Sequence, residues 1–133
     1  MRNFRDLIVW RRSHEFVLRI YGLTETFPKH EAFGLTSQIR RASVSIPTNL
    51  AEGCGRWGDG DMGRFVQIAM GSASEVDYLA LLASDLGYVP PDAYTKLTSE
   101  LNEIRRMLTG LYKQVRLGAE RRGSEPSGKP TTH

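Results

Sequence analysis

A single cysteine, Cys54, is present in the 133-residue chain, so no internal disulfide can form and a reducing compartment is favoured. No uninterrupted apolar run approaches the ~20 residues that a membrane-spanning helix needs. The first ten residues contain no apolar signal-peptide segment, which predicts a cytoplasmic protein with no membrane partner. The length fits one domain, whose core can be stable without disulfides or structural metals.

The chain also has only a small excess of positive over negative charge. Lys and Arg number 18 against 15 Asp and Glu, which gives a formal net charge of +3 and a sequence pI of about 9.2. Hydrophobic residues make up 40% and charged residues 25%. These values are typical of a globular domain and exclude a largely disordered chain, a collagen-like fibre and a disulfide scaffold. The basic balance permits nucleic-acid binding without establishing it.

No stretch shows a sustained alternation of apolar and polar residues, which would indicate β-strands. Apolar residues recur instead at steps of three and four, and this periodicity predicts helices over residues 6–26, 35–54, 61–86 and 92–117. Short connections between four long amphipathic helices predict an all-α fold, an antiparallel up-and-down four-helix bundle with left-handed crossing.

The predicted domain division separates this bundle from a tail. The bundle spans residues 1–117, whereas residues 118–133 are rich in Gly, Ser, Pro and charge and contain no core residue. We therefore predict a disordered polar C-terminal tail.

Apolar stripes define the expected core faces. The first helix has two stripes, Leu7, Trp10, His14, Val17, Tyr21 and Thr24, and Val9, Ser13, Phe16, Ile20, Leu23 and Phe27. The second helix has Leu35, Ile39, Ala42, Ile46, Leu50 and Gly53. The third has Phe65, Ile68, Ala69, Ser72, Val76, Leu79, Ala83 and Leu86. The fourth has Tyr94, Leu97, Leu101, Ile104, Leu108, Leu111 and Val115.

The faces opposite two of these stripes are not charged, although a solvated helix face normally is. The predicted oligomer interface consists of Val44, Pro47, Ala51, Met70, Ser74 and Leu81. A chain of this length cannot cover both sides of three helices, and contiguous exposed apolar patches mark interaction sites. We therefore expect self-association.

Pro47 lies inside the second predicted helix and removes a backbone donor there. Two outcomes are open. The helix either kinks at Pro47, with Ser43 and Ser45 bonding the freed carbonyls, or it breaks and restarts with Pro47 in its first turn.

No set of residues points to catalysis, a cofactor or a metal. Gly53, Gly55 and Gly58 match a dinucleotide fingerprint by letter, but they follow a helix and not a strand. The three histidines lack metal-ligand spacing, and His14 is expected to be a partly buried, hydrogen-bonded core residue. The Glu-x-x-His pattern of di-iron bundles is missing. We therefore predict a protein that is not an enzyme.

Arginines are better organised than any catalytic set. The predicted nucleic-acid-binding residues are Arg5, Arg12, Arg19, Arg40 and Arg41. The first three are spaced by seven and line one edge of a helix, and guanidinium groups suit bidentate phosphate contacts. Acidic residues alternate with several of the basic ones, so salt bridges are the alternative interpretation.

Several stretches together are similar to one known family. They include Gly34-Leu35-x-x-Gln38-Ile39-Arg40-Arg41-Ala42 and Ser45-Ile46-Pro47-x-Asn49-x-Ala51-Glu52-Gly53. Over residues 4–115 the chain resembles the bacterial four-helix-bundle proteins encoded in intervening sequences of the 23S ribosomal RNA gene. That family is also similar to the accessory variability determinant of diversity-generating retroelements.

The resemblance implies a homopentamer, and in the retroelement branch a basic channel that binds nucleic acid and a reverse transcriptase as partner. The expected function is therefore a non-enzymatic homo-oligomer that binds RNA or DNA without sequence preference. The alternative is a protein–protein adaptor, such as an accessory subunit of a retroelement reverse transcriptase. Among the motif residues, Arg41 and Glu52 lie too far apart to pair, so each is expected to bond a neighbouring helix or subunit.

Overall fold

The computed structural model describes residues 2–56 and 58–123, and within these ranges it contains helices and turns and no β-strand. The four helices are α1 (Ile8–Thr24), α2 (Leu35–Cys54), α3 (Asp59–Asp85) and α4 (Pro91–Gly123). Two short 3₁₀ turns, η1 (Phe4–Asp6) and η2 (Lys29–Glu31), precede α1 and α2.

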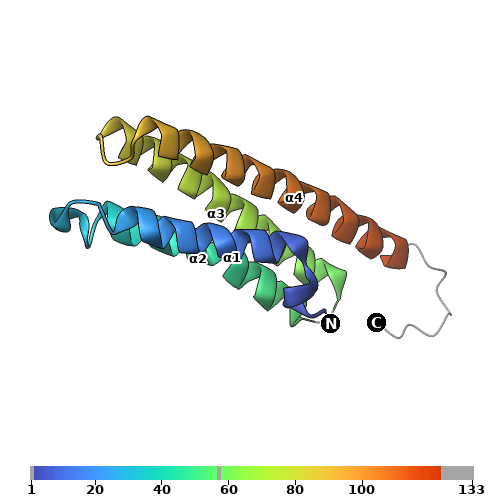
Figure 1. Ribbon diagram of the computed structural model, residues 1–133. Coiled ribbons are helices and arrows are strands. Elements are labelled where there is room, and N and C mark those ends of the chain that lie inside the picture. Colours follow the sequence, from blue (N-terminus) through green and yellow to red (C-terminus); the bar gives the residue numbers. More distant parts are fainter. Residues whose placement is uncertain (1, 57, 124–133) are drawn as a thin grey trace.

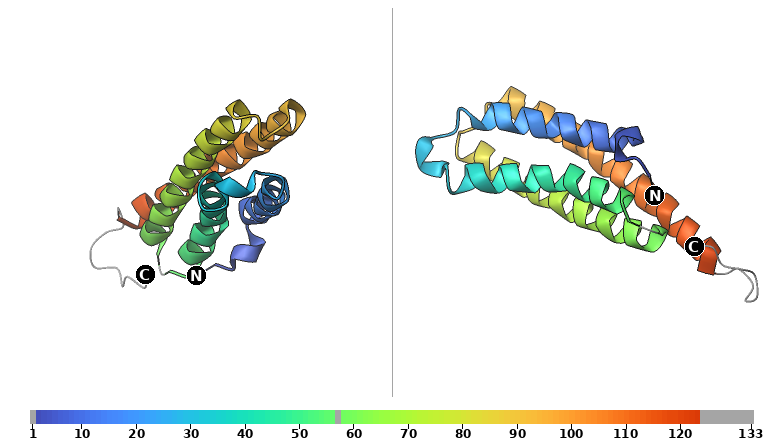
Figure 2. Two further views of the ribbon diagram at one scale, coloured as in Figure 1. Left: turned by 90° about the vertical axis from the view of Figure 1, so that its left-hand side faces the viewer. Right: turned by 90° about the horizontal axis from the view of Figure 1, so that it is seen from below.

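Each helix runs antiparallel to the one before it, and the chain forms two hairpins, α1–α2 and α3–α4, that cross at an angle (Figures 1 and 2). Each helix packs on its neighbour in sequence, and α1 also contacts α4. This arrangement confirms the predicted all-α, four-helix architecture.

The helix boundaries differ from the predicted ones by one or two residues at each end of α1 and α3, and by more at the C-terminal end of α4. α3 begins at Asp59 because Gly58, with a φ of 85°, turns the chain, and because Asp59 and Asp61 favour the positive end of a helix dipole. α4 continues through Gly123, past the predicted end at residue 117. No core contact is needed there, because good helix formers and an Arg116–Glu120 pair at 3.5 Å support the last turns.

The predicted boundary between the bundle and the tail, at residue 118, therefore falls inside α4. Residues 118–123 are helical, and the C-terminal part of α4 projects past the ends of the other helices (Figure 2). The rest of the predicted tail, residues 124–133, lies outside the described residues.

The turn between α3 and α4 is built by a glycine cap. Gly87 has a φ of 80°, the N–H of Tyr88 donates to the carbonyl of Ala83 at 2.9 Å, and the N–H of Gly87 donates to that of Ser84 at 3.0 Å. This pair of bonds satisfies carbonyls that the helix end leaves without partners. Pro91 then occupies the first position of α4, where its missing N–H has no cost.

The core confirms the stripes predicted for α2 and α4. All six α2 residues are buried, and on α4 all are buried except the half-buried Tyr94. The largest fully buried side chains of these two helices are Ile39, Ile46, Leu50, Leu101, Ile104 and Leu108.

The stripes of α1 and α3 need correction. On α1 the second stripe faces the core through Val9, Ser13, Phe16 and Ile20, whereas His14 and Tyr21 are exposed. On α3 the predicted core residues Ile68 and Leu86 are 44% and 49% exposed, and Ser72 is half-buried. Their places are taken by the next residues around the helix, Val66, Ala73 and Ala80. The other residues of the predicted α3 stripe are buried, as expected: Phe65, Ala69, Val76, Leu79 and Ala83. Both helices are apolar over more than one face, so periodicity alone does not fix how each is rotated.

Replacing Leu108 by Asp tests the core of α4. Leu108 is fully buried, and an unpaired carboxylate at that site is expected to lower the free energy of unfolding by several kcal/mol. The measurement is urea unfolding followed by circular dichroism. The neighbouring Thr109→Asp is the control, because Thr109 is exposed and its substitution is expected to cost about 0.5 kcal/mol. Equal losses for the two variants would contradict the assigned face.

Candidate functional site

The main surface feature is an open groove between the outer sides of α1 and α2, enclosing about 770 Å³. The α1 side contributes Trp10, His14, Val17, Leu18 and Tyr21, with Phe4 at one end. The α2 side contributes Val44, Pro47, Thr48, Ala51 and Glu52. Glu52 is the one carboxylate in this lining, which is otherwise almost entirely apolar.

Aromatic rings of α1 and η1 form one end of the groove. Trp10 and His14 stack with centroids 5.2 Å apart and planes 4° from parallel, and Phe4 meets Trp10 edge-on at 4.7 Å. Trp10 and His14 belong to the first predicted stripe of α1, whose members Val17 and Thr24 are buried while His14 and Tyr21 are exposed. His14, predicted as a core residue, therefore faces this groove from an exposed position.

Pro47 lies in the wall of the groove, and α2 runs through it without a break. Of the two outcomes left open by the sequence, a break and restart of the helix at Pro47 is therefore wrong. Ser43 Oγ donates to the carbonyl of Arg40 at 2.9 Å, and Asn49 Nδ2 donates to the carbonyl of Ser45 at 2.8 Å. Side-chain hydrogen bonds thus reinforce the turns on both sides of the proline.

A second depression of about 560 Å³ continues the groove toward the N-terminal end of α2. The two share Tyr21, Val44 and Thr48. Arg40 borders the second depression, where its guanidinium lies 4.6 Å from the centre of the Tyr21 ring and its Nε donates to Thr24 Oγ1 at 2.7 Å. The Arg40 guanidinium is therefore positioned by an aromatic ring and a hydroxyl group, neither of which carries a charge.

Phe33 stands at the end of this depression and is fully exposed. The loop that carries it is fixed by Glu31, whose Oε1 accepts from the N–H of Leu35 at 3.2 Å and whose Oε2 accepts from the hydroxyl of Tyr88 at 3.0 Å. The Leu35 N–H, and then the Tyr88 hydroxyl, lower the pKa of Glu31. Burial, and then Glu31, raise the pKa of Tyr88.

The six predicted interface residues fall into two groups. Val44, Pro47 and Ala51 line the groove, whereas Met70, Ser74 and Leu81 belong to another part of the surface on α3. Ser74 there accepts a hydrogen bond from Arg105 of α4 at 3.1 Å. The two groups therefore cannot meet within one copy.

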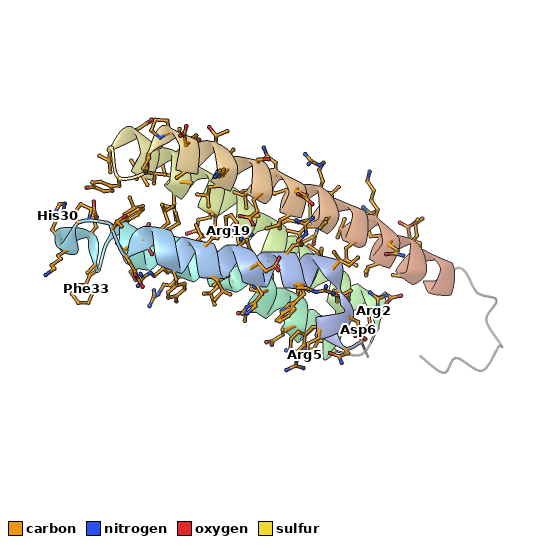
Figure 3. All side chains as sticks on the ribbon, viewed as in Figure 1. Arg2, Arg5, Asp6, Arg19, His30 and Phe33 are labelled. Carbon is orange, nitrogen blue, oxygen red and sulfur yellow. The ribbon has the colours of Figure 1, made fainter. Side chains whose placement is uncertain are left out.

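The five predicted nucleic-acid-binding arginines also separate. Arg12 and Arg19 form ion pairs with Glu103 and Glu100 across the seam between α1 and α4, as the salt-bridge interpretation expects. Arg5 lies over the Phe4 ring at 4.4 Å, near the opposite end of the molecule from Phe33 (Figure 3). Arg41 is exposed and borders the second depression beside Arg40. No carboxylate of the described residues pairs with Arg5, Arg40 or Arg41.

Two motif residues have local roles. Asn49 also donates to Ser45 Oγ at 2.9 Å, and Ser45 Oγ in turn lies 2.7 Å from Ser72 Oγ, which connects α2 to α3. Glu52 pairs with Arg56 at 3.2 Å, one turn further along its own segment. Within one copy Glu52 therefore pairs along its own segment and not with a neighbouring helix, and the expected bond to another subunit stays a prediction.

Residues for chemistry are not brought together. Within residues 2–56 and 58–123, no group of three or more His, Cys, Asp or Glu side chains could hold a metal ion. Cys54 is buried, and burial raises the pKa of its thiol. In the same ranges no helix has both the length and the hydropathy to cross a bilayer.

Sequence reasoning missed two parts of this surface. Phe33 lies between the predicted helices, in a loop that periodicity does not describe, and its full exposure depends on where the loop points. Trp10 and Tyr21 were placed on a core stripe. The signal that could have found them was the second stripe of α1, because one seam cannot bury both.

Residues 5–110 match the sequence model of the family described as 23S rRNA-intervening sequence protein. A solved structure from Bacteroides thetaiotaomicron VPI-5482 is also similar, and is described as a protein with unknown function from the S23 ribosomal protein family. It is 26% identical, has a TM-score of 0.74, and the match covers 80% of this chain and 99% of that one. No curated protein matches the sequence significantly.

Replacing Glu31 by Gln tests how the Phe33 loop is held. The pKa of Glu31 is lowered in the folded state, so the stability from its charge is present above the ordinary value of 4.5 and is lost as the pH falls below it. Urea unfolding from pH 7 to pH 3 is expected to show wild type losing its advantage over Glu31→Gln at the acidic end. Glu15→Gln, at an exposed site, is the control. A wild-type advantage that does not change with pH would contradict the role of the charge.

Proposed function

Because the chain belongs to the family of 23S rRNA-intervening sequence proteins, we propose that it is a non-enzymatic protein whose copies assemble through the outer groove between α1 and α2. The groove is the observation that carries this proposal. Exposing a contiguous apolar surface to water is unfavourable in free energy, and such a surface on a helical bundle is typical of an interaction site. The cytoplasmic location expected from the sequence is part of the same proposal.

The composition of the groove supports a protein partner. Its walls combine Trp10, Tyr21 and Leu18 with the aliphatic floor of α2, and aromatic residues are enriched where protein interfaces are most strongly bound. Leu18 is 59% exposed in one copy, so covering it removes apolar area from water.

The second apolar surface favours a ring. Met70 and Leu81 on α3 lie on another part of the molecule, and an interface that joins two different surfaces propagates head to tail. Such contacts form a closed ring when the rotation between copies closes. The number five is the one that the family resemblance implies, and we propose it here for this chain.

The variants Val44→Arg and Met70→Arg test assembly through the two surfaces. Each puts a charge into a proposed contact, so sedimentation should show smaller species while circular dichroism keeps the helical signal. Gln114→Arg on the exposed side of α4 is the control and should leave the assembly unchanged. If wild type sediments as a monomer at every concentration, the assembly proposal fails and the groove is left to another protein, as in the adaptor alternative.

A second candidate function is nucleic-acid binding, favoured by arginines whose charge no carboxylate neutralises. Arg40 is oriented by Thr24 and Tyr21, and Arg41 is exposed beside it. Together with Arg5, they retain positive charge for phosphate contacts, and a ring repeats them in every copy. Arg12 and Arg19 are less suited, because binding phosphate would break their ion pairs with α4.

Binding titrations with RNA, single-stranded DNA and duplex DNA at several salt concentrations test this candidate. Affinity is expected to fall steeply with salt through counterion release. Arg41→Gln should weaken binding to all sequences and lower the salt slope by about 1 for each copy in contact. Arg106→Gln, an exposed arginine on α4, is the control. Absence of binding at low salt would leave these arginines with structural and solubility roles.

A further inference from the structure

Phe33 carries an exposed aromatic ring on a loop that hydrogen bonds hold in place. It is fully exposed, and it points away from the bundle at the end that carries the α1–α2 loop (Figure 3). The loop is held on two sides, because Glu31 binds both the first turn of α2 and Tyr88 of the α3–α4 turn. The Tyr88 ring also packs against the Phe27 ring, with the two ring centroids 5.5 Å apart. A preformed loop loses little entropy when its side chain is bound.

The immediate neighbours of Phe33 leave its ring accessible. Ala32 and Gly34 are small and uncharged, so the residues on either side of Phe33 add neither bulk nor charge to the tip of the loop. A Cβ at Gly34 would lie 2.8 Å from Glu31 Oε1, so a larger residue there would displace the carboxylate oxygen that accepts from Leu35. The loop is thus built to present one large apolar group.

The same chain also contains a receptor of matching chemistry. The outer groove offers about 770 Å³ lined by rings and aliphatic groups, which is ample for a single benzyl side chain. Phe33 does not occupy the groove of its own copy, since its side chain is fully exposed. It borders the depression that continues the groove, so any copy seated along the groove comes close to this loop.

We propose that Phe33 of one copy inserts into the outer groove of a second copy and is the anchor of the assembly. This inference rests on the proposed self-assembly and names the contact that drives it. An aromatic anchor in a desolvated pocket carries a large part of an interface's binding energy. Because anchor and groove lie on the same chain, each copy can place its Phe33 in the groove of one neighbour and accept the Phe33 of another neighbour in its own groove, as a head-to-tail contact requires.

The first test removes the anchor or blocks the groove. Phe33→Ala should raise the dissociation constant of the assembly at least about 30-fold, and Phe33→Leu, which keeps an apolar side chain, should lose less. Leu18→Arg should block the groove, and because Leu18 is mostly exposed the fold should persist. Leu117→Ala removes a half-exposed apolar side chain on the projecting end of α4 and should change the constant less than about 5-fold.

The second test mixes the two defective proteins. Phe33→Ala keeps an intact groove, and Leu18→Arg keeps an intact anchor, so one productive contact is available between them. Sedimentation with one variant fluorescently labelled should show a mixed species of the two, although neither variant assembles alone. Circular dichroism of each variant should match wild type.

The outcomes separate the anchor from the assembly itself. Wild type that stays monomeric overturns both this inference and the proposed function. Wild type that assembles while Phe33→Ala assembles equally well overturns the anchor and leaves the assembly proposal intact. Loss of assembly in both variants without a mixed species shows that Phe33 and the groove do not pair, which overturns the inference.

Discussion

The packing of α2 against both α1 and α3 is the contact on which the rest of the structure depends. Ile39, Ile46 and Leu50 are fully buried in it. At the end of α2, a Cβ on Gly53 would lie 2.8 Å from Met62 Sδ and 3.0 Å from Phe65 Cβ, so only glycine allows this approach of α3. Because α2 is covered on two sides, its remaining apolar residues, Val44 and Ala51 among them, line the surface groove.

The other long seam, between α1 and α4, is closed differently. Arg12 and Arg19 reach across it to Glu103 and Glu100, and α1 and α4 approach each other less closely than the helices that follow one another in the chain. Exposed ion pairs of this kind contribute little net stability. They do align two helices that are far apart in sequence, and they commit two of the heptad-spaced arginines to the fold. The charge left for ligands is thereby shifted toward Arg40 and Arg41.

The sequence predicts the α2 wall of the candidate site but not its α1 wall. The uncharged back of α2 indicated Val44, Pro47 and Ala51, and all three line the groove. The opposite wall was missed because Trp10, His14 and Tyr21 share a helix with another apolar stripe of equal quality. The arginine spacing on α1 was visible, whereas their carboxylate partners on α4 depend on which helices become neighbours.

The sequence by itself determined the number of helices and the buried faces of α2 and α4. These features depend on local backbone chemistry and on helices with one clear apolar stripe. Only the tertiary structure decided which stripe of α1 is buried, which way α3 is rotated, and that Phe33 points into solvent. Periodicity places a residue around the axis of its own helix. The rotation of one helix against another is decided by side chains distant in sequence that must fill the same core.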